Sequence, residues 1–102
     1  MPREISKQEL FDLLKRLSEF ISPSGFENDI REFVKDYFAK TADRVYIDAL
    51  GNVIAVKKGS RGSGKIMIAG HMDEIGLFIS HVDEKGFLRA LPIGGVFERA
   101  LI

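Results

Sequence analysis

Two side chains suited to metal chemistry, His71 and Asp73, follow a short apolar run in this sequence. The run Ile66–Ala69 is bounded by glycines, which predicts a buried strand. Side chains two positions apart point to the same side of an extended backbone. An imidazole beside a carboxylate is the basic unit of a metal site, because the carboxylate orients the ring or binds a second ion. A His-x-Asp pair alone is weak support, since most such pairs hold no metal.

Composition narrows the classes of function. The chain has 102 residues, 45% of them apolar, which is enough for one small domain. Lys plus Arg and Asp plus Glu number 15 each, so the zero net charge argues against a nucleic-acid partner. No apolar run approaches the ~20 residues that span a bilayer, and the first residues lack a signal-peptide core. Cysteine is absent, so a metal must use His, Asp or Glu, and a cytoplasmic location is expected.

Two helices are predicted at the start of the chain. Residues 6–9 read Ser-Lys-Gln-Glu, a capping box, and leucines at helical spacing follow, which predicts a helix over about 7–20. Pro23 then breaks the helical pattern, and Ser24 with Glu27 can form a second capping box. The next helix is expected over about 26–39, with an aromatic stripe facing the core.

The rest of the chain has the pattern of strands and turns. Strands are expected over 45–48 and 53–56 around a glycine turn, and over 77–82 and 87–91 around a polar turn. The second hairpin should break at Pro92, and the apolar end at 96–102 is expected to be a strand cut short, so that the chain would be a fragment. The basic, glycine-rich run 57–64 lacks the spacing of a phosphate-binding loop, so a mobile connection is expected there.

Several separated strings together resemble the M42 family of cocatalytic metallo-aminopeptidases, which includes tetrahedral, deblocking and glutamyl aminopeptidases. They are Ser-Pro-Ser-Gly-Phe-Glu at 22–27, Asp-Ala-Leu-Gly-Asn-Val-Ile-Ala at 48–55 and Ala-Gly-His-Met-Asp-Glu-Ile-Gly at 69–76. The resemblance implies an α/β fold, with two N-terminal helices and then a mixed sheet in a zinc-peptidase-like sandwich. Residues 1–75 would belong to the catalytic domain, and 76–102 would open an inserted small β domain.

The same resemblance assigns roles to two residues. His71 would bind one of two divalent ions, most simply zinc or cobalt, with manganese left open. Asp73 is the candidate catalytic residue, since it would orient His71 and set its basicity. Peptides would be the substrates, and the protein would form a homo-oligomer of the tetrahedral type. The general-base glutamate and the other ligands lie further along the chain in such proteins, so this segment alone should be inactive and bind metal weakly.

Glu74, His81 and two other classes of function are further candidates. Glu74 is expected to be a structural loop residue, and His81 a structural histidine on a strand. A glycoside hydrolase, a label that some members of the family carry, needs two carboxyl groups facing a sugar, and nothing marks such a pair. A non-catalytic assembly or binding module with an exposed β edge stays open. Tight metal binding would favour the peptidase, cellulose hydrolysis the glycosidase, and a stable metal-free complex the binding module.

Overall fold

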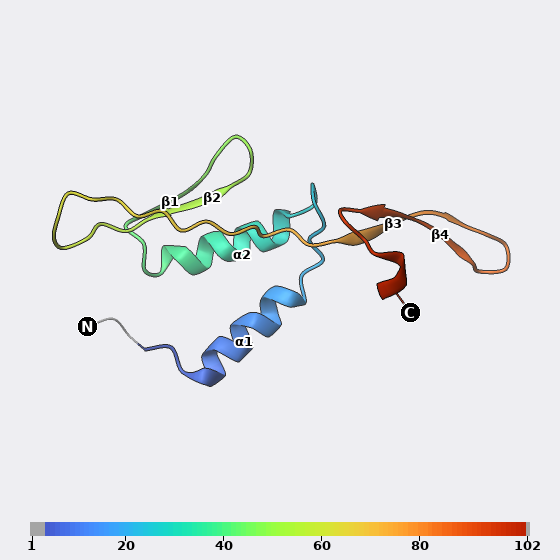
Figure 1. The fold of residues 1–102 in the computed structure, drawn as a ribbon, viewed down its shortest axis with the longest axis horizontal. Helices are drawn as coiled ribbons and strands as arrows, with labels where there is room; N and C mark the ends of the chain where they lie inside the picture. Colours follow the sequence, from blue (N-terminus) through green and yellow to red (C-terminus); the bar gives the residue numbers. More distant parts are fainter. Residues whose placement is uncertain (1–3, 102) are drawn as a thin grey trace.

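The computed structural model describes residues 4–101 and begins with two helices (Figure 1). Helix α1 spans Lys7–Ser18, two residues shorter than expected at its end. The predicted capping box is present: the Glu9 N–H donates to Ser6 Oγ at 3.1 Å, and the Ser6 N–H donates to Glu9 Oε2 at 2.9 Å. Helix α2 spans Asn28–Ala39 and starts two residues later than expected, after Glu27. The predicted second capping box is wrong, because Glu27 is the N-cap and makes no capping bond through its side chain.

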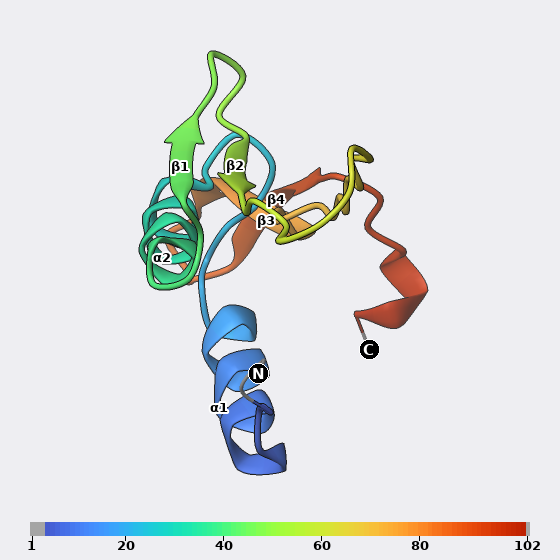
Figure 2. The ribbon, with the colours of Figure 1, turned by 90° about the vertical axis from the view of Figure 1, so that its left-hand side faces the viewer.

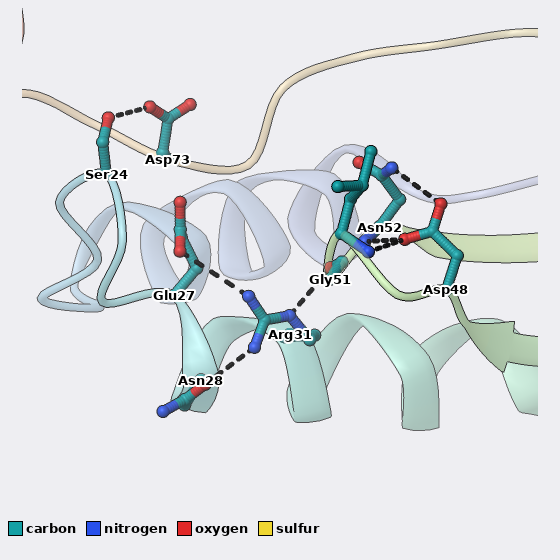
Figure 3. Close-up of polar contacts among 9 residues, drawn as sticks. Ser24, Glu27, Asn28, Arg31, Asp48, Gly51, Asn52 and Asp73 are labelled. Atoms are coloured by element: carbon teal, nitrogen blue, oxygen red, sulfur yellow. Dashed lines mark hydrogen bonds and ion pairs between the residues drawn. The ribbon is translucent and has the colours of Figure 1, made fainter.

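The first hairpin packs on α2. Strand β1 spans Arg44–Ile47 and strand β2 spans Val53–Val56, and they pair antiparallel. Helix α2 contacts both strands, and on it Ile30, which is 5% exposed, is the buried apolar residue of the described chain. Arg31 ties this helix to the hairpin turn: its Nε donates to the Gly51 carbonyl at 2.8 Å (Figure 3). The two predicted strands and their turn are confirmed.

The second hairpin forms a separate sheet. Strand β3 spans Gly76–Val82 and strand β4 spans Leu88–Ile93, again antiparallel. The expected break at Pro92 is wrong, because β4 continues through it; a two-stranded sheet has only edge strands, which tolerate proline. The expected strand at the end of the chain is also wrong where the structure describes it, since Glu98–Ala100 forms a short 3-10 helix, η1. Ile102 lies outside the described residues.

The predicted strand Ile66–Ala69 is extended but unpaired. The structure assigns it no strand within the described chain, and Ile66, Met67 and Ile68 are 93%, 89% and 95% exposed. A strand needs a neighbouring backbone to receive its hydrogen bonds, and a parallel neighbour requires a long crossover connection. Figure 1 shows this segment as a long thread from the basic loop to β3. The apolar pattern predicted a buried strand, but no strand among residues 4–101 pairs with this segment.

The α/β class, with two helices followed by strands, is confirmed. The strands form two separate antiparallel pairs in place of one mixed sheet, and the bridge between Pro23 and Glu74 is parallel. Figure 2 shows α1 projecting from the layer of α2 and the first hairpin, and its leucines are not buried in the described chain, contrary to the expectation of core packing. The aromatic side chains of α2, which were also expected to face the core, are likewise half-buried or exposed in the described chain.

The described chain is elongated. Its extents are 64 × 34 × 23 Å and its radius of gyration is 18.3 Å, against about 13 Å for a compact domain of this size. Large apolar side chains on α1, on segment 66–68 and on the second hairpin are exposed. No helix among residues 4–101 has the length and apolar character needed to cross a membrane.

Candidate functional site

The loop between the helices meets the segment after the exposed thread. The Glu74 N–H donates to the Ser22 carbonyl at 3.0 Å, and the Ser22 N–H donates to Glu74 Oε1 at 3.4 Å. Pro23 and Glu74 form the parallel bridge, and Ser22 is only 3% exposed. Glu74 therefore acts here as a structural residue of the loop, as expected.

His71 and Asp73 face each other, as their spacing predicts. His71 Nδ1 lies 2.8 Å from the backbone carbonyl oxygen of Asp73 and 3.0 Å from Asp73 Oδ1. A carbonyl oxygen is only an acceptor, and so is an ionised carboxylate. Nδ1 faces both, so it carries the proton of the neutral ring and donates. The lone pair is then on Nε2, which makes no hydrogen bond to any residue in 4–101. The ring is 85% exposed, so Nε2 is accessible.

Ser24 binds the other oxygen of the same carboxylate. Its hydroxyl donates to Asp73 Oδ2 across the gap between the loop and the segment (Figure 3). This hydrogen bond, with a smaller contribution from His71, lowers the pKa of Asp73 below its ordinary value near 3.8. Asp73 is therefore ionised at neutral pH, with one oxygen for His71 and one for Ser24.

These side chains border a shallow open depression of about 200 Å³. Gly94 and Gly95, which directly follow β4, also line it. Gly94 has φ +79°, and a Cβ there would lie 3.3 Å from Ile75 Cγ2. A side chain at this position would therefore be strained and would crowd the wall beside the site.

The described residues could hold a metal ion only in part. His71 Nε2 is a suitable nitrogen ligand, with its other nitrogen held by a carboxylate, as in most histidine–metal sites. No three His, Cys, Asp or Glu side chains within 4–101 come together to hold an ion. His81 lies on β3 opposite Arg89 and does not border the depression. The residues present thus fit one ligand of an ion and its orienting carboxylate, and residues 4–101 do not bring further ligands to this place.

Sequence reasoning missed the contribution of Ser24 to this site. The Ser-Pro-Ser-Gly run was interpreted as a joint between helices, with Ser24 as a helix cap. In the structure its hydroxyl donates to a residue 49 positions away. The local pattern carries no signal for such a distant partner. The one available hint was that this run and the His-x-Asp run both contributed to the same family resemblance.

Comparison with known proteins places the sequence in a family. The sequence model of the M42 glutamyl aminopeptidase family matches residues 51–102. A lysyl aminopeptidase of Pyrococcus furiosus is 48% identical over 93 residues, and a putative aminopeptidase of Acetivibrio thermocellus is 45% identical over 92. Each alignment covers 90% of this chain, but only 26% and 27% of the relative. The chain thus spans about a quarter of the length of these curated relatives.

Three solved structures also match most of this chain and about a quarter of their own length. An aminopeptidase from the archaeon Desulfurococcus kamchatkensis superposes with a TM-score of 0.82 at 51% identity, over 92% of this chain and 26% of that one. A Thermotoga maritima protein described as an endoglucanase gives 0.73 at 41%, over 84% of this chain and 28% of its own. A TET aminopeptidase from a marine-sediment thaumarchaeote gives 0.74 at 36%, over 87% and 25%.

Proposed function

This chain belongs to the M42 glutamyl aminopeptidase family, and from that membership we propose that it is part of a metal-dependent aminopeptidase. The reaction would be the hydrolysis of the first peptide bond of a peptide, which releases its N-terminal residue. Relatives and structural neighbours that are named aminopeptidases support this reading. Because the chain spans only about a quarter of their length, the activity is proposed for the natural polypeptide that contains this sequence.

The observation that carries the proposal is the arrangement of His71 and Asp73. Nδ1 of His71 donates to Asp73, so Nε2 is left with its lone pair directed away from the pair. This is the form of histidine that binds a divalent ion. We propose His71 as a metal ligand and Asp73 as the residue that orients it. When bound, two divalent ions would polarise the substrate carbonyl and activate the water that attacks it.

Several finer features belong to the same proposal. Zinc or cobalt is the expected metal, and two ions per site are expected from the family resemblance. A homo-oligomer of the tetrahedral type and a cytoplasmic location are proposed on the same basis, and the TET aminopeptidase neighbour supports the first of these. We also propose that residues 1–75 belong to the catalytic domain and 76–102 to an inserted β domain. The separation of the β3–β4 sheet from the β1–β2 sheet supports this division.

Two alternatives are tied to observations. The structural neighbour described as an endoglucanase raises glycoside hydrolysis. The carboxylates beside the depression argue against it, because Asp73 is bonded to His71 and Ser24, and Glu74 is bonded to the Ser22 backbone. The exposed apolar thread 66–68 favours the other alternative, an assembly module, because an unpaired strand invites pairing with another chain.

The two histidines of the sequence provide a matched test. In the natural polypeptide, His71→Ala is expected to lower bound zinc, measured by elemental analysis after dialysis against a metal buffer, and to lower peptide hydrolysis by at least about 100-fold. His81→Ala, on the exposed strand β3, is expected to leave both unchanged. Release of free amino acids is followed with peptides of varied N-terminal residue, before and after a chelator.

The outcomes separate the three functions. Hydrolysis that a chelator stops and that His71→Ala removes supports the aminopeptidase. Equal effects of the two histidine variants would refute the assigned ligand. Hydrolysis of β-glucan that survives the chelator would favour the glycosidase, and a stable complex without metal or turnover would favour the assembly module.

A further inference from the structure

We propose that Ser24 is a positioning residue for the metal ligand: through Asp73 it holds His71 in the tautomer whose Nε2 can bind an ion. The inference rests on the proposed function for the role of that nitrogen. It gives the Ser-Pro-Ser-Gly loop a part in the site, in place of a simple joint between α1 and α2.

The loop is attached to the site segment by contacts that do not involve Ser24. Two hydrogen bonds join Ser22 to Glu74, at 3.0 and 3.4 Å. Pro23 packs against Gly76 so closely that a Cβ on this glycine would lie 3.0 Å from Pro23 Cβ. These contacts hold the loop backbone against residues 74–76, so the Ser24 hydroxyl is presented at a fixed place.

Ser24 orients the carboxylate of Asp73. Its hydroxyl donates to Asp73 Oδ2, while Oδ1 lies 3.0 Å from His71 Nδ1. A carboxylate bound at only one oxygen can rotate about its last side-chain bond, since that torsion is broad. Asp73 is partly exposed, so water would compete for a freely rotating group. With Ser24 on one oxygen, the other is kept toward the imidazole.

The oriented carboxylate favours one tautomer of His71. Nδ1 of His71 faces two acceptors, the Asp73 carboxylate and the Asp73 backbone carbonyl. The hydrogen bond at one ring nitrogen decides which nitrogen carries the proton, and hence which one binds metal. Loss of the oriented carboxylate leaves only the carbonyl to hold the ring. The population of the Nδ1–H form, and with it the affinity for an ion, should then fall.

The test is ¹⁵N–¹H NMR of the histidine rings in the metal-free natural polypeptide, at alkaline pH where imidazole is neutral. His71 is expected as the Nδ1–H tautomer in the unmodified protein, with a shift toward Nε2–H in Ser24→Ala. Zinc affinity of that variant is expected to fall about threefold to tenfold, below the range of 10–100-fold typical of direct partners of a ligand histidine. Ser24→Thr keeps the hydroxyl and should restore both readouts. Ser18→Ala removes a hydroxyl that donates to the Lys15 carbonyl at 2.8 Å on the surface of α1, and should change neither.

An Nε2–H tautomer for His71 in the unmodified protein would overturn the proposal without any variant. So would a Ser24→Ala protein with unchanged tautomer and zinc affinity, or a folded Ser24→Thr protein as impaired as the alanine variant. Because the tautomer is read without metal and without substrate, the result is independent of turnover. A tautomer shift in a protein that hydrolyses no peptide would retain the positioning role and refute the proposed function.

Discussion

Replacing Gly51 with alanine should destabilise the protein more than replacing Gly86, although both glycines occupy the same place in matching hairpin turns. Their φ angles are +87° and +85°. In each turn the glycine N–H donates at 3.0 Å to the carbonyl of the aspartate three residues earlier, Asp48 or Asp83. Each aspartate Oδ1 also accepts two backbone N–H groups of its turn, all at 2.9 Å. The left-handed backbone alone should therefore cost both variants about 1–2 kcal/mol.

The difference comes from Arg31. A Cβ at Gly51 would lie 2.7 Å from Arg31 Nη2, whereas a Cβ at Gly86 would meet nothing within 4 Å. The guanidinium can move away, but it then loses its bonds to the Gly51 carbonyl at 2.8 Å and to Asn28 at 2.7 Å. Hydrogen bonds of a charged group contribute about 1.5–3 kcal/mol, and partial loss predicts an excess of about 1–2 kcal/mol for Gly51→Ala.

Urea unfolding of the natural polypeptide measures this excess, with Arg31→Met as the second arm of a double-mutant cycle. Without the guanidinium, the two glycine substitutions should destabilise equally, within the ~0.5 kcal/mol of ordinary additivity. Equal losses in the presence of Arg31 would refute the reasoning. An excess that persists in the Arg31→Met background would do so as well.

Three further results are expected. Ser6→Ala should destabilise α1 by about 1 kcal/mol, seen as faster amide exchange in its first turn, and unchanged exchange would contradict the role of the capping box. The hydrogen bonds of Asp48 to Asn52 lower the pKa of the Asp48 carboxyl below its ordinary value near 3.8. The ionised carboxylate therefore stabilises the first hairpin at pH values above that ordinary pKa, and this contribution should be lost as the pH falls through the lower pKa of the folded state. Acid titration of the β1–β2 amide signals should show the loss, and Asp48→Asn should abolish that pH dependence; an unaltered titration would be a refutation. Asp73→Asn should weaken zinc binding about 10–100-fold by equilibrium dialysis, and an unchanged affinity would remove Asp73 from the site.

Local features of the fold could be predicted because short sequence runs determine them. The capping box at Ser6 and the two hairpins needed only neighbouring residues and turn glycines such as Gly51 and Gly86. The facing of His71 and Asp73 followed in the same way, from two positions on one extended backbone.

Features that depend on distant partners could not be predicted. The apolar run Ile66–Ala69 has the composition of a buried strand, but pairing depends on neighbours that residues 4–101 do not supply. Ser24 was assigned to a helix cap because a cap is the nearest use for its hydroxyl, whereas its partner Asp73 lies 49 positions away. Such a contact is set by how the loop and the site segment pair, which no local pattern encodes.

We propose that Nε2 of His71 binds a divalent ion while Asp73 holds Nδ1. The most direct measurement is a crystal structure of the natural polypeptide loaded with cobalt, with anomalous scattering recorded at the cobalt edge. We expect a peak about 2.0–2.1 Å from His71 Nε2, the distance at which histidine nitrogen binds zinc, with Asp73 and Ser24 hydrogen-bonded behind the ring. A peak on Nδ1, or an occupied metal site that does not include His71, would contradict it.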